Sequence, residues 1–281
     1  MNQKKFEELE IRDDFMFGKV MQNKDLCRQT LEILLGITIE DINYPEKQKI
    51  IDITYKGKSI RLDIYVEDDK GIIYDAEMQN VSSDSQSPEY LSKRSRYYQG
   101  MIDLNLIEKG VPYIELNKTY VIFICTFDPF GKNRYCYTFK NRCEEDDEVE
   151  LRDDVIRIFF NTKGNTEDIP EKAKQLLHYI ETKETTNDFT RILDTEVERV
   201  KQNKLWRREY MKEFLHDFDV REEGRSLGKA EGKAEGIAIG QLMILDKLLA
   251  AGKLSIEEAA DTANMTVEEL RETFANQLQP V

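Results

Sequence analysis

Hydrophobic and polar positions change their spacing several times along the chain. Near its start, apolar residues recur at helical spacing over Phe15–Met21 and again over Leu31–Leu35, which predicts two helices. Asp13 or Asp14 can cap the first helix, and Gly36 can end the second. The pattern then changes to alternation, which is typical of strands that bury one face.

Three alternating stretches follow, and turn residues separate them. The first runs from Ile51 to Tyr55 and ends at the turn Lys56–Gly57–Lys58. The other two are Arg61–Val66 and Ile72–Met78, with the turn Asp68–Gly71 between them. These stretches predict a sheet in which the second and third strands form a hairpin.

A helix is expected directly after this hairpin. Ser87 followed by Pro88 is typical of a helix start, because serine caps the helix and proline suits its first position. The helix is expected to run to about Glu108 and to stop at Gly110.

Three more strands are expected before the pattern becomes wholly helical. The continuous apolar run Thr119–Thr126 predicts a strand that is covered on both faces. Shorter strands are expected at Arg134–Phe139 and Val155–Phe160, with the acidic run Glu144–Glu148 as a solvated loop between them. Helices followed by strands of this kind predict a mixed α/β layer fold.

The chain after Pro170 has helical patterns throughout. One long charged helix is expected from Asn187 to about Phe218, and two short capped helices over Ser255–Asn264 and Thr266–Gln277. We therefore expect three regions: an α/β core over residues 1–165, a helical region over 166–220, and a glycine-bearing helix with short C-terminal helices over 221–281.

A glycine recurs at every fourth position in the C-terminal region. Each glycine costs about 1 kcal/mol relative to alanine inside a helix. Two interpretations stay open: the segment is a loose tether, or it is a helix that packs closely against a partner, such as another copy in a homo-oligomer. The five positions are Gly224, Gly228, Gly232, Gly236 and Gly240.

The charge of the chain bears on its partners. The formal net charge of −14 argues against tight non-specific binding to nucleic acid, because affinity for phosphate comes from lysine and arginine. The charge is uneven, however, since Lys93, Arg94 and Arg96 form a basic block. A local nucleic-acid contact is therefore compatible with the composition.

Two further features bear on the compartment. The sequence has no apolar run long enough to span a membrane and no secretory leader pattern, so we expect a soluble, cytoplasmic protein without a membrane partner. No two cysteines have the CxxC spacing, and we expect them to be reduced and mostly packed. They are Cys27, Cys125, Cys136 and Cys143.

The hairpin brings acidic residues together. If it is centred on Lys70, Asp63 lies directly opposite Glu77. Alternation then gives the hairpin one polar and one apolar face. The polar face carries Asp63, Tyr65, Asp75, Glu77 and Gln79, and the apolar face carries Leu62, Ile64, Val66, Ile72, Tyr74, Ala76 and Met78.

Opposed carboxylates of this kind suit a metal ion. Side chains directly opposite each other have Cβ atoms about 4.5–5.5 Å apart. Two carboxylates held that close repel each other unless a cation lies between them. Their oxygen atoms suit Mg²⁺, Mn²⁺ or Ca²⁺. The alternative is that these acids belong to an ordinary solvated strand face.

The motifs and their order resemble a known family. Asp63, followed fourteen positions later by Glu77–Met78–Gln79, resembles the D…E-x-K core of PD-(D/E)XK nucleases. Asp13–Lys19 and Lys93–Tyr98 resemble the opening helix and the basic, tyrosine-bearing helix of the recombination-promoting nuclease family of transposases. The glycine-bearing tail is also similar to tails of that family, and the resemblance covers nearly the whole chain.

The resemblance implies a restriction-endonuclease-like core with a helical C-terminal extension. It also implies a metal-dependent DNA endonuclease linked to recombination or transposon-like mobile elements. Asp63 and Glu77 would bind the divalent metal, expected to be Mg²⁺, with Asp14 as an auxiliary acid, and a metal-activated water would cut the phosphodiester bond. Gln79 takes the place of the usual lysine, so it can hold a water by hydrogen bonds but supplies no charge.

The basic helix after the core has two interpretations. Arg94, Arg96 and Tyr97, with Lys93 beside them, could bind DNA by holding phosphates and stacking on a base. The alternative is an amphipathic helix that buries its tyrosines and Met101. We expect a mixture in which the tyrosines are packed and the arginines are turned partly toward the site.

Two functional hypotheses follow. The first is an enzyme, a DNA endonuclease with Asp63, Glu77 and Gln79 at its centre. The second is a catalytically inactive module that keeps the nuclease fold and works through its C-terminal helices in binding or oligomerisation. The second hypothesis predicts no stabilisation by a divalent metal.

Overall fold

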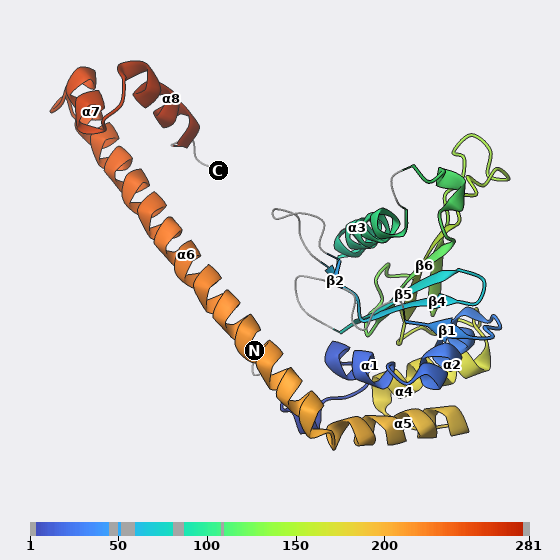
Figure 1. Cartoon of the computed structure of the whole chain (residues 1–281). Helices are drawn as coiled ribbons and strands as arrows, with labels where there is room; N and C mark the ends of the chain where they lie inside the picture. Colours follow the sequence, from blue (N-terminus) through green and yellow to red (C-terminus); the bar gives the residue numbers. More distant parts are fainter. Residues whose placement is uncertain (1–3, 45–49, 52–59, 81–86, 108–109, 278–281) are drawn as a thin grey trace. The chain divides into compact units, whose positions relative to one another are not determined.

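The computed structural model describes residues 4–44, 50–51, 60–80, 87–107 and 110–277 (Figure 1). They divide into two compact units, Met1–Tyr210 and Met211–Val281. The strand expected over Ile51–Tyr55 and the turn after it lie outside the described residues except for Ile51. That residue belongs to β2 (Ile50–Ile51), which pairs antiparallel with β3 (Ile60–Arg61).

A six-stranded mixed sheet is the centre of the first unit. Its strand order is β1-β4-β5-β6-β8-β7. The parallel pairs β5–β6 and β6–β8 form its middle, and antiparallel pairs close both sides. The strands are β1 (Ile42–Asn43), β4 (Ile64–Asp68), β5 (Ile73–Gln79), β6 (Thr119–Cys125), β7 (Cys136–Phe139) and β8 (Val155–Asn161).

The hairpin β4–β5 has the register that the alternation predicts. Tyr65 lies opposite Asp75, and Val66 lies opposite Tyr74. The same register continued by two residues sets Asp63 beside Glu77. The expected hairpin centred on Lys70 is therefore confirmed.

Helices cover both faces of the sheet (Figure 1). The helices α1 (Asp14–Val20), α2 (Lys24–Leu35), α4 (Glu171–Thr182) and α5 (Asp188–Lys201) share one core with the apolar face of the hairpin. Helix α3 (Pro88–Leu106) covers the other face with a second core. The first core takes Ile64, Val66, Tyr74, Ala76 and Met78 from the hairpin.

Leu62 does not lie on the face that alternation assigned to it. It packs in the core under α3, together with Tyr65 and Ile73. The chain bends at Asp63, between the end of β3 and the start of β4, so the alternation of β4 does not extend back to Leu62. The expected apolar face is wrong at this one position.

The ends of the early helices follow the expected chemistry. Ser87 caps α3 by accepting a hydrogen bond from the Tyr90 N–H, and Pro88 is the first helical residue. Gly36 ends α2 with a φ of 65°, in the left-handed region that glycine adopts without strain. The expected start of α3 and the expected end of α2 are confirmed, whereas α3 ends at Leu106, before the predicted end at Glu108–Gly110.

The long helix expected over Asn187–Phe218 is wrong, because the chain forms two helices there. The first, α5, ends at Lys201, and α6 (Lys204–Ala250) begins after a break at Gln202–Asn203. Oδ1 of Asn203 accepts hydrogen bonds from the N–H groups of Leu205 and Trp206, which caps the new helix. Hydrophobic periodicity alone does not show such a break.

The second unit contains most of α6 with α7 (Ile256–Thr262) and α8 (Val267–Gln277). The two short tail helices are confirmed, and Ser255 caps α7 in a capping box with Glu258. A small core joins the three helices. Its buried residues are Leu242, Leu245, Ala259, Ala260 and Leu270.

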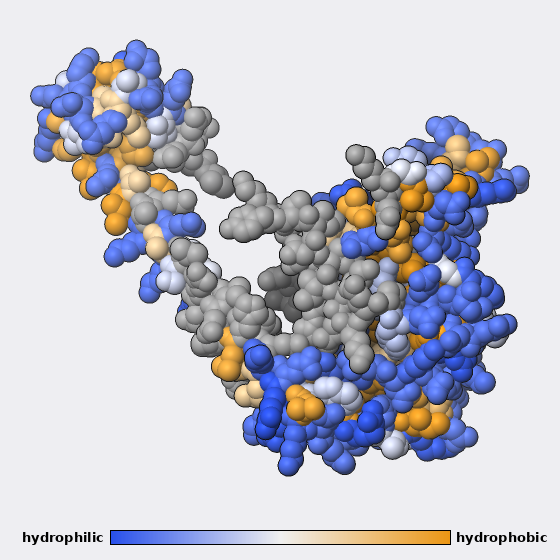
Figure 2. Space-filling view, in the orientation of Figure 1, coloured by the Kyte–Doolittle hydropathy of each residue, from blue (hydrophilic) through white to orange (hydrophobic). Residues whose placement is uncertain are grey.

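The five regularly spaced glycines all lie within α6, so the segment is helical and not a loose tether. A Cβ added at any of them would meet no described atom within 4 Å. Figure 2 shows hydrophobic residues along the C-terminal part of this helix, where Ile237 and Ile244 are exposed. The described part of the chain supplies no packing partner for the glycines.

Within the described residues, every helix is too short or too polar to span a membrane.

Candidate active site

Asp63 and Glu77 are joined through backbone hydrogen bonds at the start of the hairpin. The N–H of Asp63 donates to Oε1 of Glu77 over 2.9 Å. The N–H of Met78 donates to Oδ2 of Asp63 over 3.0 Å. The two carboxylates are thus oriented by the strands that carry them.

Asp75 is a third carboxylate on the same face of β5. It precedes Glu77 by two residues, so alternation turns both side chains toward α3. Asp75 is 0% exposed, its carboxylate oxygens accept no hydrogen bond from an N–H or hydroxyl of the described residues, and the carboxyl of Glu77 is the polar group beside them. Burying an ionised carboxylate without a partner is costly, which makes this residue a candidate ligand.

Arg94 of α3 contacts this face of the hairpin. Its Nη2 donates to Oε2 of Glu77 over 3.0 Å, and its Nη1 donates to Oε1 of Gln79 over 2.8 Å. Nε and Nη2 also donate to the hydroxyl of Tyr98, over 2.9 and 2.6 Å. Arg94 therefore joins β5 to α3 at the acidic residues.

Burial and mutual repulsion raise the pKa of all three carboxyls. Desolvation raises the pKa of Asp63 well above its usual value, and the charges of Glu77 and Asp14 add to this effect. Desolvation and the charge of Asp63 likewise raise the pKa of Asp75. The pKa of Glu77 rises to about 8 through desolvation and the charge of Asp75, although Arg94 opposes the shift. Each of these carboxyls therefore holds its proton more firmly than a solvated one does.

Asp14 approaches the site from α1, as its predicted auxiliary role requires. Its charge contributes to the raised pKa of Asp63. Gly18, one turn further along the same helix, lies so close to the hairpin that an added Cβ would be 3.5 Å from the backbone oxygen of Asp63. The first helix therefore packs directly against the acidic end of the hairpin.

The alternative of a solvated strand face is wrong. All seven residues of β5 are buried, including Asp75, Glu77 and Gln79. Helix α3 covers the polar face, because its own apolar residues Leu91 and Ile102 pack beside Ile73. Acidic side chains on a covered strand are far less usual than on a solvated one.

The predicted DNA-binding residues of α3 separate into two groups. Arg94 is turned into the acidic site, whereas Lys93, Arg96 and Tyr97 are exposed. The expected packing holds for Tyr98 but not for Tyr97, which is 40% exposed. Tyr97 lies one residue before Tyr98, and successive helical residues differ in direction by about 100°, so both cannot face the sheet.

The donor set fits a divalent cation in its chemistry. Among the described residues, no three His, Cys, Asp or Glu side chains are already gathered as a ligand set. Arg94 holds Oε2 of Glu77. The oxygens of Asp75 accept no hydrogen bond from an N–H or hydroxyl of the described residues, and carboxylate oxygens are the ligands that Mg²⁺ and Mn²⁺ prefer.

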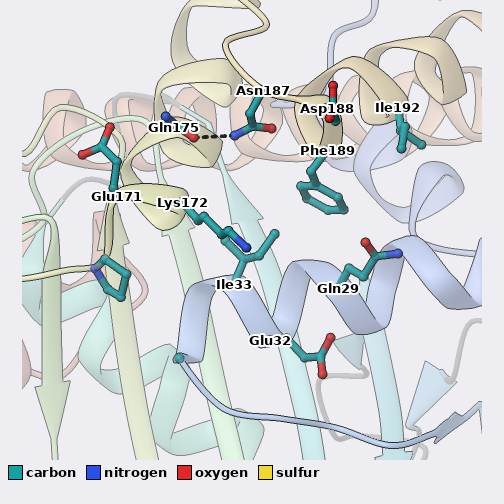
Figure 3. Close-up of a pocket in the computed structure, with 12 residues that line it drawn as sticks. Gln29, Glu32, Ile33, Glu171, Lys172, Gln175, Asn187, Asp188, Phe189 and Ile192 are labelled. Carbon is teal, nitrogen blue, oxygen red and sulfur yellow. Dashed lines mark hydrogen bonds between the residues drawn. The ribbon is translucent and has the colours of Figure 1, made fainter.

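A separate cleft of about 760 Å³ lies among α2, α4 and α5 (Figure 3). Ile33, Phe189 and Ile192 supply its apolar lining, and Asn187 donates a hydrogen bond to Gln175 at its wall. These helices cover the sheet face opposite to α3. The cleft is therefore distinct from the acidic residues.

The fold and the site define an α/β protein with an acidic centre on one face of a mixed sheet. The family model described as PD-(D/E)XK nuclease family transposase matches residues 14–213. The chain therefore belongs to the PD-(D/E)XK nuclease family transposases, and the expected fold class is confirmed. No curated protein and no solved structure matches the chain.

Two features of this candidate site are not evident from the sequence pattern. Asp75 was assigned to the polar face of the hairpin but not to the site. Asp75 lies two residues before Glu77, so alternation along the strand places both side chains on the same face. This spacing is the signal in the sequence that could have indicated Asp75. Arg94 is predicted as a DNA contact that turns partly toward the site, but its particular contacts with Glu77 and Gln79 depend on how α3 packs, which the sequence does not show.

Proposed function

We propose that the protein is a divalent-metal-dependent DNA endonuclease with a role in recombination or transposon-like mobile elements. One observation carries the proposal: Asp63, Asp75 and Glu77 lie close enough on a covered face to raise one another's pKa, and among the described residues Arg94 is the cation paired with Glu77. When all three carboxyls are ionised, as metal binding would require, three carboxylates and one guanidinium leave an excess of two negative charges. One divalent cation neutralises that excess.

Asp63 and Glu77 are the proposed metal ligands, with Asp75 as a further acid and Asp14 nearby. The backbone bonds that orient Asp63 and Glu77 support this assignment, because a metal site needs ligands whose positions are fixed. A bound Mg²⁺ or Mn²⁺ would act as a Lewis acid toward the phosphate and toward water. Glu77 would then exchange its contact with Arg94 for one with the metal.

The proposed reaction is hydrolysis of a phosphodiester bond. A water oxygen bonds to phosphorus while the bond from phosphorus to one sugar oxygen breaks. One proton of the water goes to the leaving sugar oxygen, and the other is released to solvent. The buried carboxylates orient the reacting groups, and the role of Gln79 in holding the water stays a prediction.

The exposed part of α3 is the proposed DNA contact. Lys93 and Arg96 carry positive charge on the helix that also supplies Arg94 to the site. Such side chains hold phosphates without selecting a sequence, and Tyr97 offers a ring on which a base can stack. Membership in a nuclease family supports DNA as the partner.

A second candidate function is an inactive module that acts through oligomerisation. It is favoured by α6, on which five glycines and apolar residues such as Ile237 and Ile244 have no cover among the described residues. A homo-oligomer through these helices is compatible with either function. Only the enzyme, however, requires a bound metal.

Metal-linked stability separates the two candidates. If the metal binds as proposed, Mn²⁺ at about a hundred times its Kd stabilises the protein by roughly 2.7 kcal/mol, a rise in Tm of about 5–10 °C. Glu77→Gln should remove the rise, while Glu196→Gln, at another buried glutamate, should keep it. An equal rise in all three proteins, or no rise in any, contradicts the metal site. The activity itself is tested by cleavage of supercoiled plasmid.

A further inference from the structure

We propose that Arg94 supplies the positive charge that Gln79 lacks at the cleavage site, and that Gln79 is the residue that positions Arg94. This inference rests on the proposed nuclease function and adds a division of roles to it. Gln79 stands where the family pattern has a lysine, and an amide carries no charge. The charge is needed because negative charge builds up on the phosphate during hydrolysis.

The contacts of Gln79 support a positioning role. Its Oε1 accepts a hydrogen bond from Nη1 of Arg94 over 2.8 Å, and its Nε2 donates to the backbone oxygen of Met78 over 2.9 Å. Both ends of the amide are therefore engaged, and the amide is fixed relative to the strand. An amide oxygen held in this way fixes the guanidinium that donates to it.

The surroundings of Arg94 hold its guanidinium at the carboxylates. The hydroxyl of Tyr98 accepts two of its hydrogen bonds, and its Cζ lies 4.9 Å from the centre of the Tyr98 ring. The ring of Phe123 on β6 lies 5.6 Å from the same atom. Packing against two aromatic rings leaves the guanidinium few alternative positions.

Arg94 also has access to a bound phosphate. Its side chain is 25% exposed, whereas that of Glu77, its partner, is 1% exposed. The guanidinium thus lies between the buried carboxylates and the surface. Its five N–H donors exceed the acceptors that Glu77, Gln79 and Tyr98 use, so a phosphate oxygen can be added without breaking the contact with Gln79.

A charge in this position has opposite effects on cleavage and on metal binding. It favours the negatively charged transition state, so its loss slows cleavage. It repels a divalent cation at Glu77 and competes for Oε2, so its loss strengthens metal binding. If Arg94 only stabilised the fold, its removal would instead weaken both cleavage and metal binding.

The test moves the charge from one residue to the other. Nicking of supercoiled plasmid and Mn²⁺ affinity are measured for the full-length wild type, Arg94→Ala, Arg94→Lys and the double variant Arg94→Ala/Gln79→Lys. Arg28→Ala is the matched control, because Arg28 is 27% exposed, pairs with Glu32 and lies on α2, away from the site. If Arg94→Ala does not fold, Arg94→Gln takes its place in both variants.

We expect Arg94→Ala to nick about 100-fold more slowly and to bind Mn²⁺ about tenfold more tightly. The double variant Arg94→Ala/Gln79→Lys should nick at least about tenfold faster than Arg94→Ala, and its Mn²⁺ affinity should return toward the wild-type value. Arg94→Lys should fall between the two, because it keeps the charge but not the planar fork. Arg28→Ala should lower Tm without changing either readout.

Three results overturn the inference. Arg94→Ala could nick at the wild-type rate, it could lose Mn²⁺ binding together with cleavage, or the double variant could melt at the wild-type temperature and stay as slow as Arg94→Ala. If the wild type nicks DNA and Asp63→Ala does not, each of these results removes the inference about Arg94 and leaves the proposed function unchanged. A wild type that does not nick removes the function and this inference together.

Discussion

The backbone N–H of Asp63 donates a hydrogen bond to the side chain of Glu77 over 2.9 Å. In return, the carboxylate of Asp63 accepts the N–H of Met78, the residue next to Glu77. These contacts tie the bend before β4 to the end of β5. They orient two acidic side chains that would otherwise repel each other. The fold therefore fixes this orientation without a bound ligand.

Neutralising Asp75 should stabilise the metal-free protein. Asp75→Asn removes one of three mutually repelling buried carboxylates, so we expect a higher Tm in the presence of a chelator and weaker stabilisation by Mn²⁺. Asp128→Asn should lower Tm instead, because the Asp128 carboxylate accepts hydrogen bonds from Phe130, Asn133 and Tyr137. Thermal melts of both variants check the prediction. A lower Tm for Asp75→Asn would mean that its charge is already compensated.

The metal-free protein should become more stable as the pH falls from about 8 toward 5. The folded pKa of Glu77 is raised to about 8 from an ordinary value of 4.5. The folded state therefore binds a proton that the unfolded state has already released, and this contribution is complete below 4.5 and lost as the pH rises through 8. The slope is at most about 1.4 kcal/mol per pH unit for one such group.

Urea unfolding at a series of pH values measures this dependence. Glu77→Gln should reduce it, since an amide does not titrate in this range, while the raised pKa values of Asp63 and Asp75 keep part of the dependence. Saturating Mn²⁺ should flatten it, because a bound metal favours the ionised carboxylates. A wild-type stability that falls steadily between pH 8 and pH 5 would contradict the raised pKa.

Tyr98→Phe should slow cleavage by less than the loss of Arg94 does. The hydroxyl of Tyr98 accepts two hydrogen bonds from Arg94, but the ring that packs against the guanidinium remains in phenylalanine. We expect a decrease of about tenfold, since both hydrogen bonds from Arg94 to the hydroxyl are lost while its contacts with Glu77 and Gln79 remain. Tyr179→Phe, which removes a hydrogen bond to Asp194 on another face, is the control. Equal cleavage by both variants would argue against Tyr98 as a support for Arg94.

Gly232→Ala should stabilise α6 by about 1 kcal/mol if no partner packs there. A Cβ at Gly232 meets no described atom within 4 Å. Gly252→Ala should be destabilising instead, because Gly252 has a φ of 64°, which alanine adopts at a cost. Helical circular dichroism during urea unfolding measures both. Destabilisation by Gly232→Ala, or a change in molecular mass, would show that a second chain packs closely on the glycines.

Much of the fold could be predicted from local signals. Alternation gave the correct register of β4 and β5, and the serine–proline pair at 87–88 gave the start of α3. Both signals act within a few residues of the structure they determine. The break at Gln202–Asn203 escaped prediction because helical periodicity continues on both sides of it.

The site could be predicted only in part, because its parts come from distant segments. Asp63 and Glu77 share a hairpin, so their register fixes their separation. The burial of Asp75 and the direction of Arg94 depend on the packing of α3 over the sheet. That packing is set by many apolar contacts, and no pattern within either segment reveals it.

Cleavage of supercoiled plasmid DNA tests the central claim most directly. Full-length wild type, Asp63→Ala and Glu77→Gln are compared with Mg²⁺, Mn²⁺ or Ca²⁺ and with chelator. The account predicts nicking by the wild type in at least one divalent metal, no nicking with chelator, and a loss of at least about 100-fold in both variants. Nicking that persists in Asp63→Ala, or a wild type that leaves the plasmid supercoiled in every metal, would contradict it.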